Sequence, residues 1–139
     1  MIGYLEGEVL AVEGPAAIVR TASGVGYQVT LPAPLLAEMN SGGKMVVLHV
    51  VTVVRDDEIA LYGFPDSRTK ALFSLLIKVS GIGPRLAVGL LGAFDGPALT
   101  DAILRQDVVL LATIPGVGKK TASRLCVELG DRLNAFERT

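Results

Sequence analysis

The sequence predicts two domains of different class, an all-β domain in residues 1–64 and an all-α domain in residues 65–139. Up to residue 64, β-branched and aliphatic residues form short runs divided by glycines and polar turns, a pattern typical of strands. After Pro65, the apolar residues recur every three or four positions, which is typical of helices. Half of the 139 residues are hydrophobic and 19% are charged, so the composition excludes disorder over most of the chain.

The all-β part is predicted to form an OB-fold five-stranded barrel. Five strands with one short helix between the third and the fourth is the element order of this barrel, and another small β barrel is the alternative. The short helix begins at a proline, which is favoured in the first turn. The predicted strands span residues 3–12, 16–21, 26–31, 44–54 and 59–62, and the helix lies within residues 32–39.

The all-α part contains an internal repeat. Residues 80–87 align with residues 115–122 at an offset of 35, and each segment places glycine, an aliphatic residue and glycine between an apolar helix and a basic helix. Such a repeat indicates one supersecondary unit used twice, here a helix-hairpin-helix. The predicted helices span residues 67–78, 85–91, 97–105, 108–112 and 119–134, with glycine or proline turns between them.

Each hairpin has the chemistry of an anion site. The two glycines permit a positive φ and the close approach of another backbone, and the aliphatic residue between them can anchor the turn in the core. The helix after the second glycine begins with N–H groups that lack intrahelical partners, at the positive end of the helix dipole. A DNA phosphate fits this geometry, and four cations stand near the two helix starts: Arg85, Lys119, Lys120 and Arg124.

Two nucleotide-binding alternatives fail on their residues. A dinucleotide fingerprint requires glycine where Leu86 stands, and it follows a strand rather than a helix. A P-loop requires glycine where Thr113 stands and serine or threonine where Lys120 stands. Two capping turns without a ligand remain the alternative, which the presence of two copies beside cations disfavours.

The charge divides at the same boundary as the periodicity. The whole chain has a net charge of −1, from 13 Lys and Arg against 14 Asp and Glu. Residues 1–64 hold 3 basic and 7 acidic residues, a net of −4, and residues 65–139 hold 10 basic and 7 acidic residues, a net of +3. The near-neutral total is therefore a cancellation between domains, and the helical domain is the one suited to nucleic acid.

Three acidic residues, Asp56, Asp57 and Glu58, lie between the last two predicted strands. They are consistent with a solvated turn, in which aspartate is favoured. Paired carboxylates also bind metal ions in nucleases, but no further acid or histidine is visibly placed to complete such a site. A third interpretation is a negative finger that avoids DNA or enters its centre. The residues alone leave these three interpretations open.

The remaining composition argues against catalysis, export and membrane insertion. One cysteine, Cys126, excludes a disulfide framework and a cysteine-rich zinc site, and one histidine, His49, disfavours histidine-based metal or triad chemistry. Cys126 is expected on a buried helix face and His49 in a strand. The barrel's four aromatic residues are too scattered for a single-strand stacking platform. Glu6 and Glu8 argue against a signal peptide, and residues 45–54 are shorter than the roughly 20 residues of a membrane helix. The protein is predicted to be cytoplasmic.

Over its whole length the sequence resembles the RuvA family of Holliday junction-binding proteins. Helix-hairpin-helix motifs occur in many DNA-binding proteins, but their combination with this barrel and acidic turn, in this order, is specific. The segments that carry the resemblance are Met1-Ile2-Gly3, Gly24-Val25-Gly26-Tyr27, Val54-Arg55-Asp56-Asp57, Leu61-Tyr62-Gly63-Phe64, residues 80–87, residues 115–122 and Arg124-Leu125.

The resemblance implies a non-catalytic DNA-binding subunit, without cofactor or metal, that acts in recombination and repair. It implies a homotetramer, or two tetramers enclosing the DNA, that holds a four-way junction open and square-planar without sequence preference. The family's acidic pin falls on Asp56 and Asp57. The implied DNA-binding residues are Gly81, Ile82, Gly83, Arg85, Gly116, Val117, Gly118, Lys119, Lys120 and Arg124.

The resemblance also implies partners, namely the ATPase RuvB, which drives branch migration, and the resolvase RuvC. Family members carry a third, small helical domain that contacts RuvB after a flexible acidic linker. This sequence ends at Thr139, so the third domain is expected to lie outside it, as in a truncated or proteolysed form. The resemblance therefore implies junction binding and leaves coupling to RuvB open.

Overall fold

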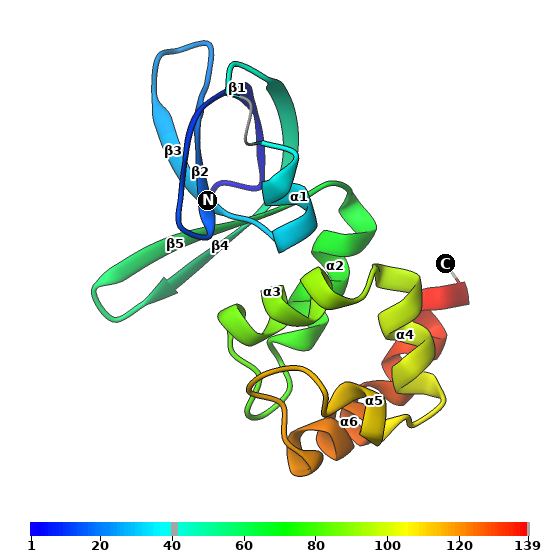
Figure 1. Ribbon diagram of the computed structural model, residues 1–139. Helices are drawn as coiled ribbons and strands as arrows, with labels where there is room; N and C mark the ends of the chain where they lie inside the picture. Colours follow the sequence, from blue (N-terminus) through cyan, green and yellow to red (C-terminus); the bar gives the residue numbers. More distant parts are fainter. Residues whose placement is uncertain (40–41, 139) are drawn as a thin grey trace. The chain divides into compact units, whose positions relative to one another are not determined.

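The computed structural model describes residues 1–39 and 42–138, the last three of these by their backbone alone (Figure 1). The chain divides into two compact units, Met1–Lys70 and Ala71–Thr139. The predicted boundary after residue 64 falls at the end of the last strand, and the units divide slightly later, inside the next helix. The first turn of that helix belongs to the barrel unit, because the Lys70 ammonium group donates a hydrogen bond of 3.2 Å to the Gly3 carbonyl.

The first unit is a closed five-stranded barrel of the OB type, as predicted. Its strands are hydrogen-bonded in the order β1-β2-β3-β5-β4, and β4 closes onto β1. All neighbours are antiparallel except β3 and β5, which are parallel. The strands are β1 (Tyr4–Glu13), β2 (Ala16–Arg20), β3 (Gly26–Thr30), β4 (Met45–Arg55) and β5 (Glu58–Phe64).

The barrel interior is filled by aliphatic side chains at alternating strand positions. In β4, Val46, Leu48 and Val50 are buried, because successive side chains of a strand point to opposite faces. The short helix α1 (Ala33–Ala37) lies between β3 and β4 in the chain, where the sequence predicts it, and starts after Pro32. The other fully buried barrel residues include Val9, Ala17, Val19 and Val29.

β5 is longer at both ends than the strand predicted over residues 59–62, since Glu58, Gly63 and Phe64 are also strand residues. Gly63 pairs with Val50 in β4. A Cβ atom at this position would lie 2.8 Å from a Val29 methyl group and 2.9 Å from a Leu31 methyl group. The glycine is therefore required by side-chain packing inside the barrel.

The second unit is helical, as predicted, and two of its helices begin at an aspartate that caps them. Asp95 accepts a hydrogen bond of 2.8 Å from the Ala98 N–H, and Asp107 accepts one of 3.0 Å from the Leu110 N–H, so both act as N-caps. The helices are α2 (Ser67–Leu76), which begins in the barrel unit, α3 (Pro84–Ala93), α4 (Gly96–Leu104), α5 (Val108–Leu111) and α6 (Lys119–Arg138).

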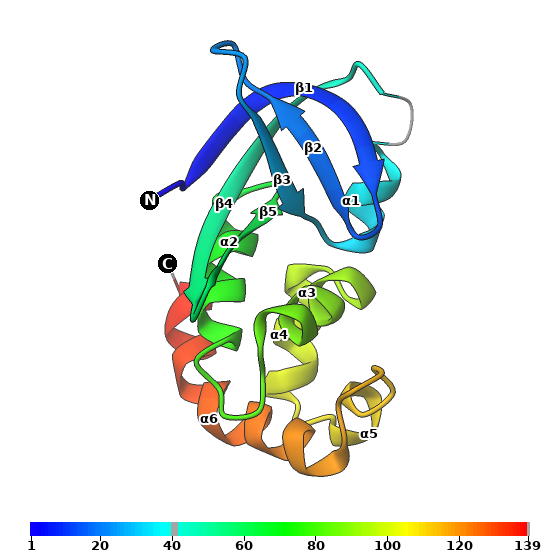
Figure 2. The same ribbon diagram turned by 90° about the vertical axis from the view of Figure 1, so that its left-hand side faces the viewer.

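The core of this unit lies where α4 and α5 pack against α6 (Figure 2). Its side chains recur every three or four positions, as the sequence periodicity predicts. Residues that are almost completely buried include Leu72, Phe73, Leu76, Leu90, Leu99, Ile103, Leu111, Leu125 and Leu129.

No single helix in the described chain is both long and apolar enough to cross a membrane. α3 and α4 reach that length and composition only when they are taken together, and they meet at an angle of 101°. Their apolar side chains, among them Leu90 and Leu99, fill the core of the helical unit.

Candidate nucleic-acid interface

The two predicted hairpins have the same backbone geometry. Gly81 and Gly116 both have a φ of 90°, a conformation that side chains with a Cβ atom rarely adopt. The N–H of Ile82 donates to the carbonyl of Val79 at 3.0 Å, and the N–H of Val117 donates to the carbonyl of Ile114 at 2.9 Å. The sequence repeat is therefore a structural repeat, with the same turn closed by the same hydrogen bond.

The residue between the glycines anchors each turn. Ile82 is 3% exposed and Val117 is 4% exposed. Both side chains are buried in the core of the helical unit, so apolar packing holds each turn in place. The predicted anchoring role is thus observed for both residues, and a direct contact of their side chains with DNA is not favoured.

The second glycine of each hairpin has no structural reason to be glycine. Gly83 has an extended backbone, with φ −89° and ψ 175°. Gly118 also lacks a left-handed φ. A Cβ atom at either position would meet no protein atom within 4 Å. Because neither conformation nor packing requires glycine here, the open space above both turns is suited to the close approach of a ligand.

Each second glycine leads directly into a helix, α3 after Gly83 and α6 after Gly118. The first intrahelical bonds are donated by Ala87 to the Gly83 carbonyl at 3.0 Å and by Ala122 to the Gly118 carbonyl at 2.9 Å. The N–H groups before these donors have no carbonyl one turn earlier in the helix. Since Pro84 has no N–H, α3 presents one donor fewer than α6.

The two hairpins pack against each other reciprocally. A Cβ atom on Gly81 would lie 3.9 Å from the Thr121 hydroxyl oxygen, and one on Gly116 would lie 3.2 Å from a Leu86 methyl group. Adding the repeat offset of 35 to Gly81 and Leu86 gives Gly116 and Thr121, so the two contacts are equivalent when the hairpins are exchanged. Equivalent contacts of this kind indicate that the two hairpins are related by a two-fold axis. The turn of each hairpin therefore lies against the first helical turn of the other, and the two helix N-termini form one surface.

The predicted cations are exposed around this surface. Arg85, Lys119 and Lys120 are all solvent-exposed. Arg124 is also exposed, and its guanidinium donates a hydrogen bond of 2.9 Å to the Ser80 hydroxyl. The sequence groups Arg124 with the second hairpin, whereas the structure brings its charge to the loop of the first hairpin. Its position across the two hairpins is a tertiary feature that the repeat does not reveal.

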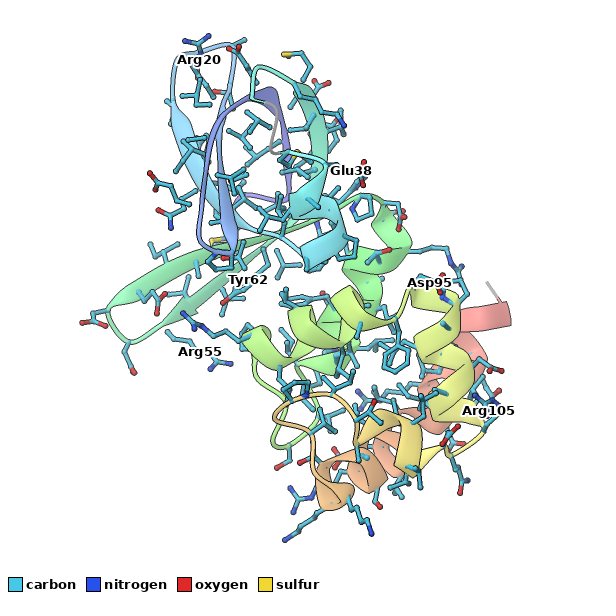
Figure 3. All side chains as sticks on the ribbon, in the orientation of Figure 1. Arg20, Glu38, Arg55, Tyr62, Asp95 and Arg105 are labelled. Atoms are coloured by element: carbon cyan, nitrogen blue, oxygen red, sulfur yellow. The ribbon has the colours of Figure 1, made fainter. Side chains whose placement is uncertain are left out.

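Arg105 is a cation of the same unit that is already paired. Its guanidinium donates to the Asp101 carboxylate at 2.8 Å and to the Asp107 carboxylate at 3.2 Å (Figure 3). The hydrogen bond that the guanidinium donates to Asp101 is the main reason that the pKa of Arg105 is raised. This ion-pair cluster at the end of α4 distinguishes Arg105 from the cations near the hairpins.

The acidic turn, formed by Asp56 and Asp57, connects β4 and β5. Arg55 and Glu58 are the last paired residues of the two strands, so the loop between them has two residues. Asp56 has a φ of 44°, a left-handed conformation in which aspartate is among the tolerated residues. Both aspartates and Glu58 are exposed. Within the described residues, no three His, Cys, Asp or Glu side chains are arranged to hold a metal ion.

Comparison with known proteins identifies both units. A family model described as the RuvA N-terminal domain matches residues 1–63, and one described as a SAM-like helix-hairpin-helix tandem matches residues 73–131. The Holliday junction branch migration complex subunit RuvA of Pseudomonas aeruginosa strain LESB58 is 44% identical over 137 residues, which are 99% of this chain and 68% of the relative. The chain belongs to the RuvA family.

Other RuvA proteins give the same result. The RuvA subunit of Geotalea daltonii is 45% identical over 133 residues, which are 96% of this chain and 66% of the relative. The RuvA subunit of Legionella pneumophila strain Philadelphia 1 is 39% identical over 137 residues, which are 99% of this chain and 69% of the relative. The chain thus spans about two thirds of the length of these RuvA relatives.

In this RuvA-family chain, the single histidine and the single cysteine are in packing positions. The His49 ring contacts the Tyr4 ring edge to face, with their centroids 5.6 Å apart. Cys126 lies buried on α6. Burial, and to a smaller extent the charge of Asp107, raises the pKa of its thiol, so the reactive thiolate is disfavoured.

Sequence reasoning missed three residues that shape the RuvA hairpin surface. Ser80 receives the hydrogen bond from Arg124, and Leu86 and Thr121 pack against the first glycine of the opposite hairpin. The only available signal was their position inside the two repeated segments. The exchange of contacts between the copies becomes visible only when both hairpins are folded.

Proposed function

We propose that this chain binds four-way DNA junctions by their shape, as a non-catalytic subunit of a branch migration complex. The observation that carries the proposal is the pair of matched hairpins, each with an unobstructed second glycine at the start of a helix. The RuvA relatives are named subunits of the Holliday junction branch migration complex, which supports a four-way junction as the DNA substrate.

Each hairpin would bind a phosphate of the DNA backbone. The N–H groups at the start of α3 and α6 donate to phosphate oxygens, and the helix dipole favours the negative charge. The open space at Gly83 and Gly118 admits the phosphate close to the backbone. The proposed site comprises Gly81, Ile82, Gly83, Arg85, Gly116, Val117, Gly118, Lys119, Lys120 and Arg124, with Ile82 and Val117 acting as buried anchors.

The two-fold relation of the hairpins suits a duplex arm. The two strands of DNA are antiparallel, so a pair of two-fold related sites can bind one phosphate on each strand with the same geometry. Contacts to phosphates carry no direct sequence information. The proposed interface therefore recognises the course of the backbones, and the DNA can slide through it during branch migration.

The acidic turn would act at the centre of the junction. In the proposed homotetramer, four copies of Asp56 and Asp57 surround one axis. Two like charges 4 Å apart repel by about 1 kcal/mol in water, and by several times more in a drier site. Phosphates of a duplex that continued straight across the centre would meet this repulsion, whereas strands that turn into separate arms avoid it.

The proposal includes the partners of the complex. The chain would assemble as a tetramer, or as two tetramers that face each other across the DNA, and would work in the cytoplasm beside RuvB and RuvC in recombination and repair. RuvB would supply the ATP hydrolysis that moves the DNA. The role proposed for this chain is to bind the junction arms and to keep the strands apart at the centre.

A binding assay with matched DNA tests the proposed function. A four-way junction and a linear duplex that contains the same sequences would be compared by gel shift, together with a second junction of unrelated sequence. The proposal predicts similar affinity for the two junctions and clearly weaker binding to the duplex. Equal affinity for junction and duplex would contradict it.

A further inference from the structure

The hairpin formed by β4 and β5 carries an exposed apolar pair directly behind the acidic turn. Val54 and Ile59 are opposite each other in the antiparallel register. Val54 is 55% exposed and Ile59 is 73% exposed. Figure 1 shows the two strands continuing past the rest of the barrel to this end of the hairpin.

The barrel does not explain this pair. Opposite residues of an antiparallel pair share one face, and the next pair on the same face is Thr52 and Leu61. Leu61 belongs to the barrel core, and the Thr52 hydroxyl donates to the Ile2 carbonyl at 2.7 Å. The apolar face of the hairpin therefore extends one pair beyond the part that the barrel covers. A polar β-branched pair would preserve the hairpin and hydrate better.

Charge and size restrict what can cover the pair. Asp56, Asp57 and Glu58 are exposed within a few residues of it, together with one exposed cation, Arg55. The local net charge is −2, so anionic groups, including phosphates, are repelled there. Two side chains are also far smaller than the roughly 800 Å² per partner of a stable protein interface. An uncharged, flat and apolar surface of small area fits both restrictions, and the face of a nucleobase is such a surface.

We propose that Val54 and Ile59 form an apolar wedge that packs against the base faces exposed at the crossover of a four-way junction. This inference rests on the proposed function. At the crossover the helical stack is interrupted, and an apolar side chain can replace part of the lost stacking, as wedge residues do when they enter base steps. The acidic turn repels phosphates, and the wedge contacts the bases that remain near the axis.

The double variant Val54→Thr with Ile59→Thr tests the wedge. Threonine is β-branched and suits a strand, so the hairpin is retained while apolar surface is replaced by hydroxyl groups. The matched control is Val47→Thr, because Val47 lies on the same strand and is 47% exposed. The probe is a four-way junction with 2-aminopurine in the base pair beside the crossover, whose fluorescence rises when the base loses its stacking.

At saturating protein, the wild type and Val47→Thr should raise the 2-aminopurine fluorescence to the same level. With the double variant, the ratio of unstacked to stacked 2-aminopurine should be roughly tenfold lower than with the wild type, because each substitution removes apolar surface that contacts the bases. Ile59→Gln alone serves as a second variant at the most exposed position of the pair, and should give an intermediate shift. Thermal unfolding of every variant, followed by circular dichroism, checks the fold.

The outcomes separate the wedge from the proposed function. If the wild type does not prefer the junction over duplex, both fail. If the wild type prefers the junction but both variants unstack the bases as fully as the wild type does, only the wedge fails. If the double variant instead changes the sedimentation of the protein without DNA, the pair is a contact between copies of the chain, and the wedge is again overturned.

Discussion

At the scale of single residues, the glycines of the hairpins divide into two kinds. Gly81 and Gly116 have a φ of 90°, so they are required by the backbone conformation whatever the turn binds. Gly83 and Gly118 are free of that constraint and face open space. The first kind shapes the turn, and the second kind keeps the space in front of the helix N-terminus clear.

The acidic turn allows charge to be changed without changing conformation. Asparagine tolerates the left-handed φ of Asp56 about as well as aspartate does, so Asp56→Asn with Asp57→Asn should fold normally. We expect the preference for junction over duplex to fall by about fivefold or more, which corresponds to the loss of ~1 kcal/mol of repulsion. Competition gel shifts measure this ratio. An unchanged ratio would remove the electrostatic role of the turn.

At the scale of elements, the strands and helices could be predicted from periodicity because each buries one face. The exceptions have tertiary causes. The strand predicted over residues 59–62 ends before Gly63, but Gly63 is a strand residue that packs closely against Val29 and Leu31. The residue that corresponds to Arg124 in the first copy of the repeat is Gly89, which has no side chain. The alignment of the two copies therefore could not predict the hydrogen bond from Arg124 to Ser80. A contact between distant segments cannot be deduced from spacing within either segment.

The start of α6 should bind phosphate more strongly than the start of α3. It presents one more N–H donor, since α3 begins at Pro84, and it carries Lys119 and Lys120. Lys119→Ala with Lys120→Ala should therefore weaken binding to junction and duplex alike, and by more than Arg85→Ala does. Gel shifts on both DNAs measure the effect. The control is Arg105→Ala, whose cation is held by two aspartates, and equal losses for all three would contradict the assignment.

At the scale of the whole molecule, the net charge of −1 conceals two opposite halves. The acidic half contains the turn proposed for the junction centre, and the basic half contains the hairpins proposed for the arms. The split was visible in the sequence because it coincides with the change from strand to helix periodicity. The proposed tetramer, which would place four such turns around one axis, depends on contacts between copies of the chain. A local sequence pattern does not predict such contacts.

Salt dependence reports how many phosphates the assembly neutralises. If each of the eight hairpins of a tetramer neutralises one phosphate, the logarithm of the junction affinity should fall with the logarithm of the salt concentration at a slope of about −7. Fluorescence anisotropy between about 50 and 200 mM salt covers a suitable range. A slope near −1 would contradict binding through many hairpins.

The most direct test of the account is the double variant Gly83→Ser with Gly118→Ser. Serine is a favoured residue before a helix, and its Cβ atom meets no protein atom at either position. The free energy of unfolding, measured in urea, should therefore be unchanged or higher by about 0.3 kcal/mol per site. The junction affinity, measured on the same protein, should fall by about tenfold or more, because the side chain occupies the space and the donors proposed for phosphate. Undiminished junction affinity in a stably folded variant would contradict the claim that these hairpins bind the DNA backbone.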